Sequence, residues 1–100
     1  MQGLMRQAQK MQEQMAEFNE EFATREFEIN AGGGAVSITI NGKKEITRLD
    51  IKPEIVDPDD IETLSDILTA GVNEAIRTVE EAFNEGTEKI SGGLGMPGMF

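Results

Sequence analysis

Apolar side chains in the first part of the chain recur at alternating steps of four and three residues. Between them stand mostly glutamine, glutamate, lysine and asparagine, and no proline or β-branched residue interrupts the segment. This spacing predicts a helix over residues 3–22 with a narrow apolar seam, the pattern typical of coiled-coil-like contacts. The seam consists of Leu4, Ala8, Met11, Met15, Phe18 and Phe22.

The hydrophobic period changes to two after this helix. The segments TREFEIN (24–30) and AVSITIN (35–41) alternate apolar and polar side chains, which predicts two strands with one buried face each. A third strand is predicted from Glu45 to Ile51. Its phase is less regular, because Ile46 falls on the opposite face from Leu49 and Ile51, and a bulge or a contact with a partner would explain the mismatch.

Glycines mark both connections of the predicted sheet. AGGG at 31–34 is a loose loop between the first two strands. Asn41-Gly42 predicts a tight type I′ turn before the third strand, because both central positions of that turn need positive φ. Pro53 ends the sheet, which is therefore a three-stranded antiparallel meander.

A second helix is predicted to start at Asp57 and to end between Lys89 and Gly92. Asp57 is expected to cap it and Pro58 to occupy its first position. Its broad apolar face is suited to covering a sheet, and Gly71 could permit close packing there. The face consists of Ile61, Leu64, Leu68, Val72, Ala75, Val79, Ala82, Phe83 and Ile90, widened by Ile67 and Ile76. Residues 1–90 thus form one domain, and the Gly/Pro/Met-rich residues 91–100 are expected to form a flexible tail.

The element order predicts an α+β fold, an α-β-β-β-α protomer with long N-terminal and C-terminal helices. A helix of twenty residues is about 30 Å long. A three-stranded sheet is only about 10 Å across, with strands of about 20 Å. The first helix therefore overhangs its own sheet, and its exposed seam favours a homodimer. The predicted dimer interface is Leu4, Met11, Met15, Phe18 and Phe22.

The composition restricts the possible chemistry. The chain has no Cys and no His, so disulfides and thiolate zinc sites are excluded, and the most common acid–base and nucleophilic groups are missing. We therefore expect no enzymatic activity, no cofactor or metal, and no small-molecule substrate. No apolar run is long enough to span a membrane, and the polar N-terminus lacks a signal core, so a cytosolic protein is expected.

Charge is distributed unevenly along the chain. The net charge is −10, with seven Lys/Arg against eight Asp/Glu in residues 1–52 and two against eleven in residues 53–100. An acidic protein repels nucleic acid at long range. Contacts with DNA would depend on local positive windows, which are residues 1–12 and 43–52.

Several short patterns have two possible interpretations, one functional and one structural. Residues 32–34 could cradle a phosphate, but they follow no P-loop pattern, and a hairpin loop is favoured. Asp57, Asp59 and Asp60 could bind a cation, but helix capping explains them. Methionines on the first helix could form a promiscuous binding surface or a cofactor site, but adaptable packing in a subunit interface is favoured. The acidic run 80–88 could be an interaction surface or a solvated face.

Taken in order, these segments resemble the YbaB/EbfC family of bacterial nucleoid-associated proteins. LMRQAQKMQEQM is similar to the opening helix of that family, and GGGAVSITINGKKEITRLDIKPEIV to its loop, strands and junction. DPDDIETLSDILTAGVNEAIRTVEE resembles its long second helix, and GMPGMF its tail. The resemblance covers nearly the whole chain.

This resemblance implies a nucleoid-localised, cytoplasmic homodimer that binds double-stranded DNA with low sequence preference. Projecting helices would grip the duplex through phosphate contacts, which position a protein without specifying sequence. The residues that match are Arg6 and Lys10 on the first helix, and Arg77 and Lys89 on the second. The alternative hypothesis is a protein–protein interaction module that uses the first-helix seam or the C-terminal tail without DNA.

Overall fold

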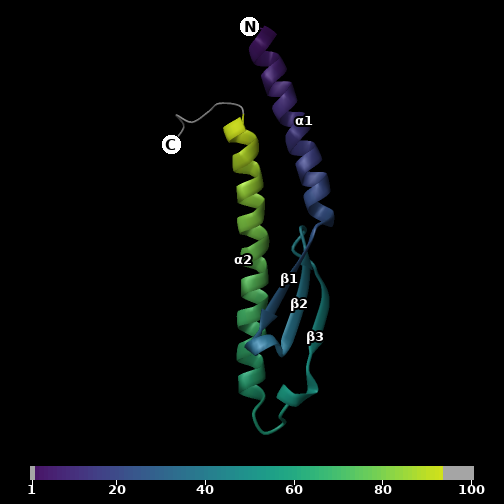
Figure 1. Ribbon diagram of the computed structural model, residues 1–100, viewed down its shortest axis with the longest axis vertical. Coiled ribbons are helices and arrows are strands. Elements are labelled where there is room, and N and C mark those ends of the chain that lie inside the picture. Colours follow the sequence, from purple (N-terminus) through teal and green to yellow (C-terminus); the bar gives the residue numbers. More distant parts are fainter. Residues whose placement is uncertain (1, 94–100) are drawn as a thin grey trace.

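The computed structural model describes residues 2–93 and has the predicted α-β-β-β-α order (Figure 1). The elements are α1 (Gln2–Thr24), β1 (Glu26–Ala31), a 3-10 turn η1 (Gly32–Gly34), β2 (Val36–Asn41), β3 (Ile46–Ile51), a second 3-10 turn η2 (Pro53–Ile55) and α2 (Ile61–Gly93). The α+β fold class is therefore confirmed. The predicted tail lies outside the described residues from position 94 on, and residues 91–93 belong to α2.

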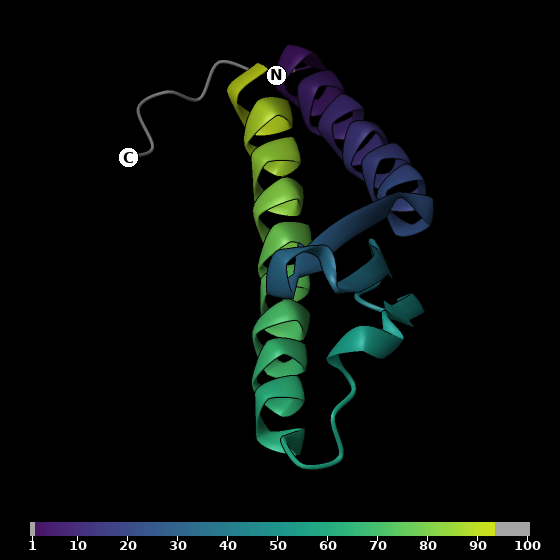
Figure 2. The ribbon, with the colours of Figure 1, turned by 60° about the horizontal axis from the view of Figure 1, so that its bottom comes forward.

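The sheet is an antiparallel meander in the order β1-β2-β3, with α2 packed along one face (Figures 1 and 2). The central strand β2 alternates buried and half-buried residues, because its apolar side chains point at α2. The core cluster consists of Val36, Ile38, Ile40, Ala75, Val79 and Phe22. Gly71 lets α2 approach closely, since a Cβ there would stand 2.9 Å from the Ile38 side chain.

A β-bulge resolves the irregular phase of the third strand. Thr39 pairs with Arg48, but its neighbour Ile40 pairs with Ile46, which leaves Thr47 as the extra residue. Leu49 pairs with Ile38, and paired residues share a face of the sheet. The bulge thus places the apolar side chains of β3 on the same face as those of β2.

The turn between β2 and β3 differs from the predicted type I′ geometry. Asn41 and Gly42 do not have positive φ; Lys44 does, at 65°. The amide of Lys44 donates to the carbonyl of Asn41, and the amide of Asn41 donates to the carbonyl of Glu45. The loop therefore has three residues and ends in a left-handed residue. Gly42 is needed for a different reason: a Cβ there would collide with the backbone carbonyl of Phe22.

The start of α2 also differs from the prediction. The carboxylate of Asp57 accepts the amide of Asp59, which forms a separate turn before the helix. The helix begins at Ile61, and Asp60 is its cap, because its carboxylate accepts the amide of Thr63 at 3.3 Å and the hydroxyl of Thr63 at 2.6 Å. Asp57, which we expected to be the cap, instead positions the chain one turn earlier.

Replacing Asp60 by alanine is expected to lower the free energy of unfolding by about 1 kcal/mol, the typical cost of removing an N-cap. Asp59→Ala removes a neighbouring carboxylate for which the described residues show no side-chain bond, and should change stability by less than about 0.5 kcal/mol. Urea denaturation of the two variants measures both changes. Equal losses would show that Asp60 contributes only its charge.

Helix α1 lies beyond the sheet, antiparallel to the C-terminal half of α2 (Figures 1 and 2). An aromatic cluster joins them: the Phe18 and Phe83 ring centroids are 5.4 Å apart, and Phe22 lies 5.3 Å from Phe18. The ring of Phe18 occupies the space above Gly86, where a Cβ would collide with it. The predicted overhang is therefore real, and the molecule measures 69 × 26 × 15 Å. We call α1 and residues 80–93 of α2 the arm.

Candidate nucleic-acid interface

Three of the four candidate cations lie on the arm. Lys10 of α1 and Lys89 of α2 line one shallow cleft of about 390 Å³ between the two helices. Arg6 stands one turn from Lys10 on the same helix and is exposed. Within residues 2–93, none of the three makes an ion pair. The fold thus gathers Arg6, Lys10 and Lys89 at the end of the molecule farthest from the sheet.

Arg77 does not join this group. It is twelve residues before Lys89 on α2, about 18 Å along the helix axis. Its guanidinium donates to the carboxylate of Glu74 at 2.6 Å, in an exposed pair one turn apart. Partial neutralisation by that carboxylate leaves Arg77 the weakest of the four candidates for a phosphate contact.

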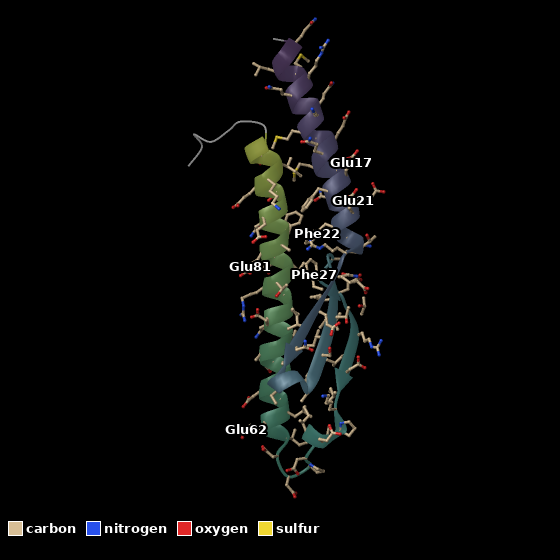
Figure 3. The ribbon with its side chains drawn as sticks, viewed as in Figure 1. Glu17, Glu21, Phe22, Phe27, Glu62 and Glu81 are labelled. Atoms are coloured by element: carbon tan, nitrogen blue, oxygen red, sulfur yellow. The ribbon has the colours of Figure 1, made fainter. Side chains whose placement is uncertain are left out.

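Carboxylates interrupt the positive surface of the arm. Glu17 and Glu21 line the same cleft as Lys10 and Lys89. The sequence could have indicated that Glu17 lies beside Lys10, because the two are seven residues apart and such residues share one face of a helix. Glu81 lies on the outer side of α2, as does Glu62 near the start of that helix and outside the arm, whereas Phe22 lies between the helices (Figure 3). Acidic side chains therefore stand beside the cations of the arm.

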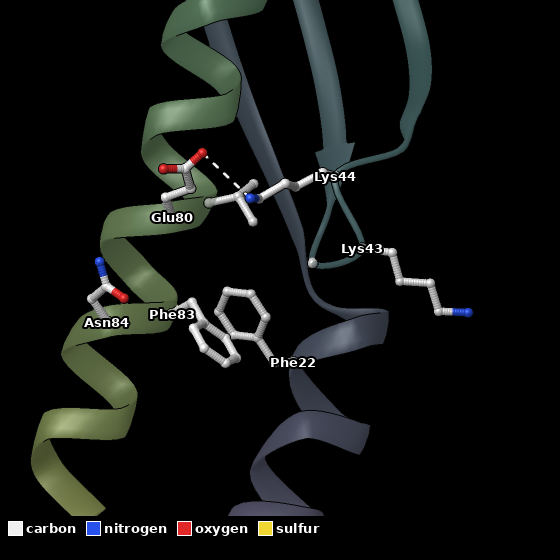
Figure 4. A pocket seen from close by; sticks show the side chains of 8 residues that line it. Phe22, Lys43, Lys44, Glu80, Phe83 and Asn84 are labelled. Atoms are coloured by element: carbon white, nitrogen blue, oxygen red, sulfur yellow. Dashed lines mark hydrogen bonds and ion pairs between the residues drawn. The ribbon is translucent and has the colours of Figure 1, made fainter.

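A second group of cations lies at the base of the arm, and the positive window 43–52 indicated part of it. The guanidinium of Arg25 stands over the Phe27 ring, 4.7 Å from its centroid. Lys44 pairs with Glu80 at 3.3 Å across a cleft of about 470 Å³, while Lys43 points away from α2 (Figure 4). The fold brings Arg25 beside this turn, because the amide of Gly42 donates to its carbonyl.

The predicted dimer-interface residues fall into two groups. Phe22 is only 4% exposed and belongs to the core of its own protomer, and Phe18 packs against it. Leu4 is 68% exposed, and Met11 and Met15 are half-buried. Only the N-terminal part of the seam therefore remains open for a contact outside the protomer.

The polar and charged side chains of the described residues all reach the surface. No polar or charged side chain in residues 2–91 is buried, and no group of three His, Cys, Asp or Glu is placed to hold a metal ion there. None of the helices within residues 2–93 combines the length and apolar character that a membrane crossing needs. In the glycine loop 32–34, Gly32 lies against the side chain of Ile67 on α2.

Comparison with known proteins agrees with the family resemblance of the sequence. The model of the YbaB/EbfC DNA-binding family matches residues 1–94. A nucleoid-associated protein of Clostridium novyi is 50% identical over 97% of this chain and 85% of its own length. One of Clostridium acetobutylicum is 48% identical over 99% of this chain and 88% of its own length.

A solved structure shares the fold. It is the crystal structure of an uncharacterized protein from Helicobacter pylori, with a TM-score of 0.65 and 24% identity. The match covers 78% of this chain and 90% of that one, and at this identity it supports the architecture alone. Together with the family match over residues 1–94, these relatives establish that the chain belongs to the YbaB/EbfC DNA-binding family.

Proposed function

We propose that the protein is a non-enzymatic, nucleoid-associated homodimer in the cytoplasm that binds double-stranded DNA with low sequence specificity. The observation that carries the proposal, beyond family membership, is the placement of Arg6, Lys10 and Lys89 at the tip of the arm. They are exposed and make no ion pair within the described residues. Such cations are available for phosphate oxygens.

The described part of the arm offers side chains for electrostatic contact with phosphates and few side chains that could recognise DNA bases. Its cations are two lysines and one arginine on helices whose other exposed residues are largely glutamine and glutamate. A dimer would present six of these cations. If each neutralises one phosphate, log K should fall with log salt with a slope of about −5.

A salt titration on a random duplex of about 30 base pairs tests the proposal. We expect binding at low salt that weakens by about a thousandfold between 50 and 200 mM, as about six phosphate contacts require. The affinity should differ by less than about tenfold among duplexes of unrelated sequence. Absence of binding at low salt would contradict DNA as the partner.

The second candidate function is a protein-interaction module, and one observation favours it. Leu4 and Met5 are 68% and 67% exposed at the tip of α1, in a chain whose net charge of −10 repels nucleic acid. Met11 continues this open seam toward the sheet. If the titration shows no DNA binding, the tip of α1 is the surface on which a protein partner should be sought.

A further inference from the structure

The apolar seam of α1 is only partly covered within the described residues. Met11 and Met15 are half-buried, whereas every residue from 2 to 10 is exposed, including Leu4 at 68%. Leu4, Ala8 and Met11 follow one another at helical spacing on one side of α1, and we call them the tip seam. The tip seam is therefore an apolar stripe that residues 2–93 leave largely open.

The position of the end of α2 explains why the cover stops. The ring of Phe18 lies over Gly86, and the helices run antiparallel, so the start of α1 lies toward the end of α2 (Figure 1). Met11 is seven residues before Phe18 and Gly93 is seven after Gly86, which places them at about the same level. Helix α1 therefore extends past α2 by about nine residues, or about 13 Å.

We infer that residues 94–100 cross from the end of α2 to α1 and pack on the tip seam of their own copy. Their sequence is LGMPGMF, in which four of the seven side chains are large and apolar and none is charged. Pro97 and two glycines oppose a continuation of α2 as a helix. The chain thus leaves the axis of α2 at the level where the seam of α1 becomes exposed.

Residues 94–100 are long enough to reach the whole tip seam. Seven residues span up to about 25 Å when extended. Leu4 lies seven positions before Met11, so it is about 10 Å farther along α1 than the end of α2. The axes of packed helices are about 8–10 Å apart. The segment can therefore cross to α1 and still run along it as far as Leu4.

Attachment to α2 favours this segment over a separate partner. A covalently linked segment is present at an effective concentration on the order of millimolar. A second copy packed seam against seam would bring together two tips that carry Arg6 and Lys10 and no acid in residues 2–12. Like charges disfavour such a contact. Residues 94–100 are uncharged and avoid this repulsion.

The contact leaves Arg6 free for phosphate. Arg6 follows Leu4 by two residues, which is about 200° around the helix, so it lies on the side of α1 opposite to the tip seam. Packing of residues 94–100 and binding of DNA through Arg6 can therefore occur in the same molecule. Loss of one of these contacts does not require loss of the other.

The absence of tryptophan provides a direct probe, because Phe100→Trp places a single indole in the full chain. We expect its emission to lie at shorter wavelength than that of free tryptophan. Adding Leu4→Asp should make acrylamide quench it about threefold faster or more, because packing would desolvate the new charge. Gln2→Asp is the matched control on the opposite side of α1 and should leave emission and quenching unchanged.

A thiol in the seam gives an independent readout. Leu4→Cys introduces the only thiol of the chain. A second variant adds serine at the four large apolar positions of the segment, which are Leu94, Met96, Met99 and Phe100. The serine substitutions should speed the reaction of residue 4 with a thiol reagent by about threefold or more, because its cover is lost. Gln2→Cys should react at the same rate with and without them.

Three results would overturn the inference. An indole at position 100 that acrylamide quenches as fast as free tryptophan would show that the segment stays in solvent. Protection that disappears on dilution would assign the tip seam to a second copy. Equal effects of Leu4→Asp and Gln2→Asp would show that the seam is not the contact. Protection that is independent of concentration and lost only in Leu4→Asp would establish the packing of residues 94–100 on α1.

Discussion

Reversing the charge at Arg6 and Lys10 is expected to weaken binding to a random duplex by about a thousandfold or more near 0.1 M salt. In a dimer the Arg6→Glu/Lys10→Glu variant removes four of six candidate phosphate contacts, each of which releases about one counterion. The slope of log K against log salt should therefore change from about −5 to about −2. Loss of affinity with a reduced slope identifies these two side chains as phosphate contacts.

The matched control makes the same change of charge elsewhere. Lys43→Glu/Lys52→Glu reverses two exposed lysines away from the tip of the arm. If Arg6 and Lys10 contact the phosphates, this control should lose less than about tenfold, through long-range repulsion, and keep its slope. Equal losses in the two variants would contradict a contact on α1 and indicate that only net charge matters.

Periodicity predicted the elements well, because it depends on local chemistry. The alternation of apolar residues in 24–30 and 35–41 indicated the two strands, and the seam of 3–22 indicated α1. What periodicity cannot specify is the partner of each apolar face. Phe18 and Phe22 belong to the predicted seam, yet they pack on α2 of the same chain.

The candidate site was only partly predictable for the same reason. The charge of Lys10 and Lys89 is visible in the sequence, but their common cleft depends on α1 lying along the end of α2. The pair between Arg77 and Glu74 follows from helical spacing and could have been predicted. The exposure of Ile46 and Leu49 on β3 could not have been predicted, because it depends on how many strands α2 covers.

Gly42 shows how a correct prediction can rest on a different physical cause. The Asn-Gly pair indicated a hairpin, and a hairpin is present. Its glycine is required because the turn contacts the C-terminal end of α1, where the amide of Gly42 donates to the carbonyl of Arg25 at 3.0 Å. This contact joins the end of α1 to the turn between β2 and β3, so the position of α1 depends on a residue outside that helix.

Gly42→Ala is therefore expected to lower the free energy of unfolding by about 3 kcal/mol. The new Cβ would collide with the carbonyl of Phe22, a backbone atom, so the turn and the end of α1 must separate. Overpacking of this kind costs about 1–3 kcal/mol, and loss of the hydrogen bond to Arg25 adds about 1 kcal/mol. For a chain of this size the melting temperature should fall by about 12–24 °C.

Two alanine variants separate this collision from the general effect of replacing glycine. At Gly3 no atom lies within 4 Å of the new Cβ, so Gly3→Ala should be neutral or stabilising by up to about 1 kcal/mol. At Gly86 the Cβ meets only the ring of Phe18, which can rotate, and the gain in helix propensity offsets part of the cost. The melting temperature of Gly42→Ala should lie well below those of both variants. Calorimetry should be done at one fixed protein concentration, because the melting temperature of a dimer depends on concentration. If Gly42→Ala melts within about 4 °C of the native chain, the turn yields easily, and the arm is not held rigidly against the sheet.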